Sequence, residues 1–225
     1  MRIDPRLVRL RLITGTQQPD ASQPNSGVVP PEDRDSLIAA FNAGFKMSES
    51  RGGWFSSGRQ AIPLRTGAAS LVLRDDGTAD VGLWGRDVTM SPSVIAVRQN
   101  LQLLIDGGVQ TALVATPAFE SVWGNTVRHR TAAWRSGVGV TKEGLLVYGA
   151  GKALTVRQLA NGLLAAGAVR AMELDINSQF VDAYLYHQSP AGPVGTKLAT
   201  AMRYGPEHYL TSQARDFVEV LERKH

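Results

Sequence analysis

The segment TVRQLANGLLAAGAVRAMELDIN, residues 155–177, combines a helix signal with a strand signal. Thr155 and Gln158 have the spacing of a capping box, which marks the first turn of a helix. Gly167 stands where a helix ends with a C-cap glycine. Beyond this glycine, apolar and polar residues alternate, as is typical of a strand. We therefore predict a helix that passes directly into a strand.

Three polar residues of this strand, Glu173, Asp175 and Asn177, alternate with apolar ones over residues 170–180. Alternate residues of a strand share a face, so these side chains should lie side by side. Two positions along a strand span about 6.6 Å, close to the carboxylate separation of inverting glycosidases, about 6.5–9.5 Å. A solvent-facing polar stripe on an edge strand has the same pattern, so the spacing alone does not establish a catalytic pair.

The rest of the chain contains two hairpin signals and several helix signals. Apolar alternation around short turns predicts hairpins over residues 68–84 and 137–151. Apolar spacing and candidate caps predict further helices over residues 37–42, 91–104 and 214–224. Residues 15–35 are rich in Pro, Gln, Ser and Asp, and predict a loop. We expect an α+β fold, a single domain over residues 1–225 with a largely antiparallel mixed sheet and packed helices.

Composition excludes several classes of function. The 225 residues are 43% hydrophobic and carry a net charge of +4, with Lys and Arg scattered, so we expect no nucleic-acid partner. The absence of cysteine excludes disulfides and thiolate nucleophiles. No apolar run is long enough for a membrane span. The charged start is unlike a signal peptide, so we expect a mature exported or cell-envelope domain, with a cytosolic protein as the alternative.

A second polar cluster, FNAGFKMSESRGGWFSSGRQ, covers residues 41–60. Its glycines, hydroxyl groups and cations could surround a polar ligand, with Trp54 as a cap and Arg51 or Arg59 as counter-charges. A long surface loop with its necessary turns would have the same composition. A third candidate is Arg135, in a stretch interrupted by small residues, which could reach into a cleft or simply lie at the surface.

In their order along the chain, these clusters resemble the phosphodiester glycosidase family, which includes an enzyme that removes N-acetylglucosamine from a phosphodiester. The stretches NAGF (42–45), RSGVG (135–139) and LDINS (174–178) are similar to the family's N-G-G-F, R-[ST]-A-[IV]-G and L-D-G-G-G-S elements. LLIDGG (103–108) also fits the family. The resemblance spans residues 36–190 and points to the bacterial, actinobacterial branch. Ala43, Ile176 and Asn177 replace family glycines.

The resemblance implies a hydrolase that cleaves a glycosidic bond at the anomeric carbon of a sugar-1-phosphodiester or a bacterial cell-surface glycan. Asp175 would stabilise the oxocarbenium-like transition state or act as base or nucleophile. Arg135 would hold an anionic leaving group. The catalytic candidates are Asp175, Glu173 and Arg135. The expected carbohydrate contacts come from Asn42, Gly44, Phe45, Trp54, Arg59, Ser136 and Asn177. We expect no cofactor and no metal.

Two alternatives stay open. A glycosidase for a neutral polysaccharide would use Glu173 together with Asp175 as paired carboxylates. A catalytically inactive module would keep the fold and bind a cell-wall or capsular glycan, because the replaced glycines change what fits beside the backbone. The sequence indicates neither the sugar nor the oligomeric state.

Overall fold

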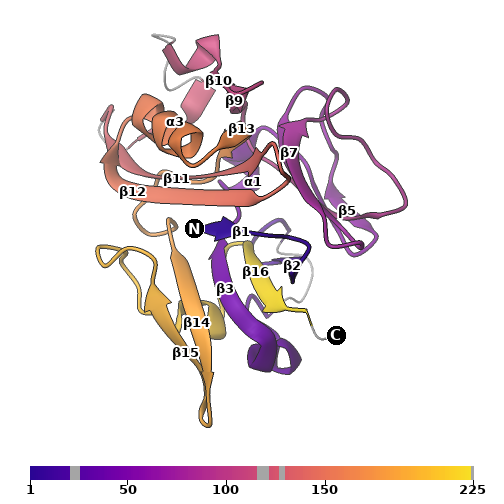
Figure 1. The fold of residues 1–225 in the computed structure, drawn as a ribbon, viewed down its shortest axis with the longest axis vertical. Helices are drawn as coiled ribbons and strands as arrows, with labels where there is room; N and C mark the ends of the chain where they lie inside the picture. Colours follow the sequence, from indigo (N-terminus) through magenta and orange to yellow (C-terminus); the bar gives the residue numbers. More distant parts are fainter. Residues whose placement is uncertain (21–25, 116–121, 127–129, 224–225) are drawn as a thin grey trace.

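The computed structural model describes residues 1–20, 26–115, 122–126 and 130–223. Figure 1 shows a fold built mainly from β-sheets, with a helix packed on one of them. The strands form three sheets, and the pairings that join the named strands in the described residues are antiparallel. The prediction of a largely antiparallel fold is therefore confirmed, and the parallel contribution is an isolated bridge between Trp84 and Val88.

Each sheet draws strands from distant parts of the chain. The first, sheet A, has the order β1 (Arg2–Ile3), β12 (Leu146–Leu154), β11 (Ala133–Thr141), β13 (Ala168–Glu173), β9 (Leu103–Asp106) and β10 (Val109–Gln110). Sheet B has the order β15 (Gly192–Lys197), β14 (Ala183–Ser189), β3 (Leu37–Asn42), β16 (Phe217–Glu222) and β2 (Val8–Ile13). Sheet C has the order β5 (Arg59–Ile62), β4 (Trp54–Ser56), β8 (Val94–Gln99), β6 (Ala69–Arg74) and β7 (Ala79–Leu83).

The described helices are short apart from α3. They are η1 (Pro31–Ser36), α1 (Met47–Ser50), η2 (Ala112–Ala115), α3 (Val156–Ala165) and η4 (His208–Leu210). In the described residues, no helix combines the length and apolar character needed to cross a bilayer.

The predicted passage from α3 into β13 is confirmed. Thr155 Oγ1 accepts a hydrogen bond from the Gln158 N–H (3.2 Å), and Gln158 Oε1 accepts one from the Thr155 N–H (2.9 Å). After the helix, Gly167 adopts φ +94°, a left-handed conformation that favours glycine. The helix packs closely on sheet A because Gly137 of β11 has no side chain; a Cβ there would lie 3.0 Å from Leu163 Cδ1.

Three of the predicted helices are wrong, because residues 37–42, 94–99 and 217–222 form β3, β8 and β16. These runs are buried almost throughout, and a short continuous apolar run does not distinguish a buried strand from a buried helix. The predicted strand over residues 170–180 is also too long, since β13 ends at Glu173. Asp175 therefore follows the strand rather than belonging to it. Both predicted hairpins are confirmed, as β6–β7 and β11–β12.

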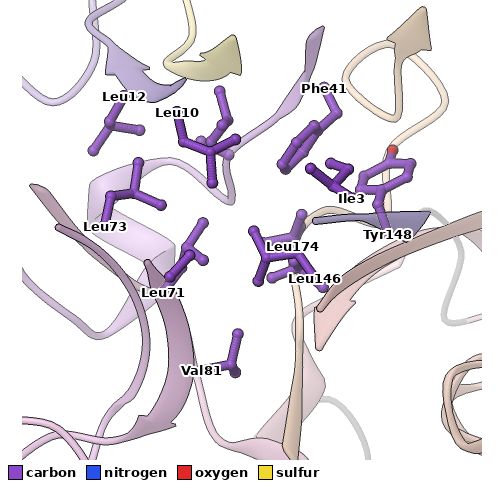
Figure 2. Close-up of a cluster of buried hydrophobic side chains, with 14 of the residues drawn as sticks. Ile3, Leu10, Leu12, Phe41, Leu71, Leu73, Val81, Leu146, Tyr148 and Leu174 are labelled. Atoms are coloured by element: carbon purple, nitrogen blue, oxygen red, sulfur yellow. The ribbon is translucent and has the colours of Figure 1, made fainter. Parts of the chain in front are cut away.

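The three sheets share one hydrophobic core. Figure 2 shows Leu10 and Phe41 of sheet B, Leu71 and Val81 of sheet C, and Tyr148 of sheet A in a single cluster. Full burial of such a side chain contributes about 1.5–3 kcal/mol. The contacts between the sheets thus position the polar ends of their strands.

We expect Leu71→Ala to destabilise the protein by about 2–5 kcal/mol, because Leu71 is 1% exposed and its truncation leaves a cavity. Urea unfolding followed by circular dichroism measures the change. Leu185→Ala is the matched control, since Leu185 is 41% exposed, and should cost less than about 0.5 kcal/mol. Equal losses in the two variants would contradict the assignment of Leu71 to the shared core.

Candidate functional site

Three neighbouring strands bring polar residues to one end of sheet B. Asp182 directly precedes β14, Asn42 ends β3, and Asp216 directly precedes β16. Because these neighbours are antiparallel, the starts of β14 and β16 lie beside the end of β3. The Asn42 N–H donates to the Asp182 carbonyl (3.0 Å), and the Ala43 N–H donates to the Asp216 carbonyl (3.3 Å). The aspartate backbones thus flank Asn42 and stand two strand spacings, about 10 Å, apart.

A pocket of about 440 Å³ opens at this end of the sheet. We call it the aspartate pocket; its polar lining includes Asn42, Asp182, His208, Arg215 and Asp216. Both aspartates are almost fully buried, at 0% and 1% exposure. Burying carboxylates without complete pairing is costly, so their position indicates a function beyond packing.

Asp182 is suited to hold and release a proton. Its Oδ1 accepts a hydrogen bond from the Tyr184 hydroxyl (3.1 Å). Its Oδ2 makes no hydrogen bond within the described residues and lies 3.8 Å from His208 Nε2. Burial raises the pKa of Asp182 to about 6 and lowers the pKa of His208 to about 4. His208 is therefore neutral at pH 7, and Asp182 titrates close to neutrality.

Asp216 is held by a buried arginine. Its Oδ2 accepts a hydrogen bond from Arg98 Nε (2.6 Å), while its Oδ1 makes none within the described part of the chain. The other Arg98 nitrogens donate to the carbonyls of Gln99 (2.7 Å) and Phe45. Arg98 reaches this position because Gly44 has no side chain; a Cβ there would lie 3.0 Å from the guanidinium. Asp216 thus keeps one free oxygen beside a fixed cation.

Asp175 is engaged on both carboxylate oxygens. Oδ1 accepts hydrogen bonds from the N–H groups of Ile176 (2.7 Å) and Asn177 (2.9 Å). Oδ2 lies 3.1 Å from Arg215 Nη2, and the Arg215 guanidinium carbon sits 4.3 Å from the centroid of the Phe180 ring. Burial raises the pKa of Asp175 to about 6, against the opposing effect of Arg215. Asp175 contacts the pocket through Arg215.

The stretches that resemble family motifs meet through hydrogen bonds. Asn42 Nδ2 donates to Ser136 Oγ (3.0 Å), and the Tyr148 hydroxyl donates to Asn42 Oδ1 (2.8 Å). Ser136 Oγ also accepts from the Asp175 N–H (3.2 Å), and the Ser136 N–H donates to the Asp175 carbonyl (2.9 Å). The structure therefore brings Asn42, Ser136 and Asp175 together.

Arg135 and Glu173 form an enclosed ion pair in sheet A. Arg135 Nη1 lies 2.5 Å from Glu173 Oε1, both side chains are 0% exposed, and Arg135 Nε donates to the Leu154 carbonyl (2.9 Å). Burial raises the pKa of Glu173 to about 7, although Arg135 opposes the shift. Neither side chain is among the described residues that line the aspartate pocket.

The remaining predicted contacts lie elsewhere. Trp54 is 2% exposed and lines, with Arg59, a separate hollow of about 450 Å³; Arg59 also pairs with Asp20 (2.8 Å). Asn177 lines a third hollow of about 200 Å³. Phe45 is buried, and its N–H donates to an amide oxygen of Asn100 (3.3 Å). The structure thus separates Trp54 and Arg59 from the Asn42–Ser136–Asp175 group. Asn177 contacts that group through its N–H, which donates to Asp175 Oδ1, and Phe45 contacts Arg98.

The sequence-based predictions missed Asp182, His208, Arg215 and Asp216. Arg215 and Asp216 fell inside the helix predicted over residues 214–224. Once β16 is known to start at Phe217, both residues stand at a strand end, where sheet sites collect. Within the described residues, no group of three or more acidic or histidine side chains is arranged to hold a metal ion.

Comparison with known proteins identifies a structural neighbour. No protein-family model and no curated protein matches this sequence. The catalytic domain of zebrafish N-acetylglucosamine-1-phosphodiester alpha-N-acetylglucosaminidase (NAGPA), solved auto-inhibited by its pro-peptide, superimposes with a TM-score of 0.60 and 15% identity. The match covers 96% of this chain and 73% of the zebrafish domain. The chain shares the fold of this glycosidase domain.

A second solved structure, a hypothetical protein from Synechocystis, is more distant. It has a TM-score of 0.49 and 13% identity over 99% of this chain and 58% of that one. The similarity to NAGPA concerns the fold alone at this level of identity, so the chemistry must be argued from the residues of this chain.

We expect Asp182→Asn to stabilise the protein at pH 7.5 by about 1–3 kcal/mol and to have little effect at pH 4. The folded-state pKa of Asp182, about 6, lies above its ordinary value. The folded protein therefore binds the proton more tightly than the unfolded chain, and this contribution is lost as pH rises through 6. Urea unfolding at both pH values measures the effect. The control Asp35→Asn alters an exposed position; a destabilised Asp182→Asn at pH 7.5 would contradict the prediction.

Proposed function

We propose that the protein is a glycoside hydrolase whose reaction takes place in the aspartate pocket. The observation that carries the proposal is the pair of buried carboxylates, Asp182 and Asp216, at the starts of β14 and β16, the two strands that flank β3. Each carboxylate has an oxygen that makes no hydrogen bond in the described structure. The shared fold with the NAGPA catalytic domain supports a hydrolase. We propose a sugar-1-phosphodiester or a bacterial cell-surface glycan as substrate.

The two carboxylates have environments suited to different roles. Asp182, with a pKa of about 6, would donate a proton to the leaving oxygen as the bond to the anomeric carbon breaks. Asp216, fixed by Arg98, would face the positive charge that develops on the sugar and accept a proton from the water as its oxygen bonds to the anomeric carbon.

The remaining predicted residues would support this site. Asn42 would fix the backbone between the two aspartates through its bonds to Ser136 and Tyr148. The enclosed pair of Arg135 and Glu173 would hold the end of β13, where the chain turns toward Asp175. In this proposal, Arg135 does not bind the leaving group, since Glu173 occupies its guanidinium.

We expect Asp182→Asn to lower turnover by about 10²-fold or more on alkyl glycosides and far less on p-nitrophenyl glycosides or glycosyl phosphodiesters. The reason is that p-nitrophenolate and phosphate leave with little protonation. On alkyl glycosides the wild-type rate should fall as pH rises above about 6, when Asp182 loses its proton. A screen of these three substrate types, followed by the variant on each hit, makes the measurement.

Asp35→Asn serves as the exposed control and should retain wild-type turnover. Full activity of Asp182→Asn on alkyl glycosides would reject its role as the acid. A large loss in Glu173→Gln instead would favour the neutral-polysaccharide alternative. A wild type that binds glycans but hydrolyses none would favour the binding module.

A further inference from the structure

Arg215 occupies an unusual position in the aspartate pocket. It stands two residues before β16 and lines the pocket, with its side chain 13% exposed. Asp175 pairs with Nη2 from one side, and the Phe180 ring lies against the guanidinium face. The cation is therefore fixed at the pocket wall rather than extended into solvent, so little conformational freedom would be lost on binding a ligand.

Two nitrogens of this guanidinium are unused. Arg215 Nε and Nη1 are buried and make no hydrogen bond to any residue that the structure describes. Arg98, which pairs with Asp216, donates from all three of its nitrogens. A buried charged donor without a partner is energetically costly, so the difference between the two arginines indicates that Arg215 is kept ready for an external acceptor.

We propose that Arg215, oriented by Asp175, determines specificity by binding an oxyanion of the substrate, a phosphate or a carboxylate, beside the scissile glycosidic bond. The proposal rests on the proposed function for the reaction and deepens it by naming the recognised group. Asp175 is then a positioning residue, because both its oxygens are engaged and it reaches the pocket through Arg215.

The charges around the pocket are consistent with an anionic ligand. Arg98 balances Asp216, and Asp175 balances Arg215. Asp182 is the remaining acidic group of the described lining, and its protonated form does not repel an anion. That form is also the one that a general acid requires. An oxyanion on Arg215 and a proton on Asp182 would therefore favour each other.

The test measures anion binding directly, without turnover. Isothermal titration of the purified chain uses inorganic phosphate, acetate and a neutral methyl glycoside as probes, followed by glucose 1-phosphate and glucuronate. We expect phosphate, acetate or both to bind the wild type. Arg215→Met should weaken anion binding by about 10-fold or more, the loss of one or two charged hydrogen bonds. Arg215→Lys, which keeps a point charge without the planar fork, should lose less.

Two further variants separate recognition from structure. Asp175→Asn keeps Arg215 but removes the carboxylate that orients it, so anion binding should weaken several-fold. Binding of the neutral glycoside should stay unchanged. Arg59→Met, which removes an arginine from a different hollow, should bind anions as the wild type does. Melting temperatures identify any variant that fails to fold. If Arg215→Met does not fold, Arg215→Lys still tests the proposal, because it keeps a cation beside Asp175.

The comparison between phosphate and acetate identifies which oxyanion the site prefers. Anion binding that survives Arg215→Met and Arg215→Lys unchanged, or that disappears equally in Arg59→Met, would overturn the inference. Equal loss of anionic and neutral ligands would also overturn it. Phosphate binding through Arg215 with no hydrolysis of any substrate would support the inference and reject the proposed reaction, so the two failures are distinguishable.

Discussion

The side chain of Asn42 is the hydrogen-bonded joint on which the arrangement of the site depends. Its amide nitrogen binds Ser136 and its amide oxygen accepts from Tyr148, both in sheet A, while its backbone N–H binds the Asp182 carbonyl in sheet B. Phe41, the preceding residue, packs on Tyr148 with ring centroids 4.9 Å apart. One buried amide thereby fixes the end of β3 against the neighbouring sheet. A buried amide that found no such partners would be strongly unfavourable, which makes this geometry specific.

Around this joint, the structure buries three arginine–carboxylate pairs: Arg98–Asp216, Arg135–Glu173 and Arg215–Asp175. Burial of charge is costly, and such pairs seldom stabilise a fold relative to apolar packing. All three pairs lie at strand ends around the site, which suggests why the fold tolerates the energetic cost of burying them. They hold polar groups at defined positions in a low-dielectric environment, where electrostatic effects are strong. Arg215 has two nitrogens without a hydrogen bond in the described structure, whereas all three Arg98 nitrogens donate. This difference distinguishes an arginine that holds the site in place from the one that we propose binds the substrate.

Part of this organisation could be predicted from the sequence. The helix over 155–166, the strand after it and both hairpins follow from local signals: a capping box, alternation and turn residues. Residues 37–42, 94–99 and 217–222 could not be assigned in this way, because they are buried on both sides of a sheet and lack a clear period. Since β3 and β16 were expected to be helices, the strand ends that carry Asp182, Arg215 and Asp216 could not be recognised as one place.

The sequence by itself determined the elements whose signals are local, and it placed Asn42, Ser136 and Asp175 in motifs that resemble those of a glycosidase family. The tertiary structure decided which charged side chains border the pocket and which are enclosed. Arg135 and Arg215 are equally plausible from composition, yet one is enclosed with Glu173 and the other borders the pocket. Whether a charged side chain borders the pocket depends on which strands are neighbours and on where each strand ends. Strand pairing joins residues more than 100 positions apart, as between Asn42 and Phe217, so no local pattern along the chain encodes it.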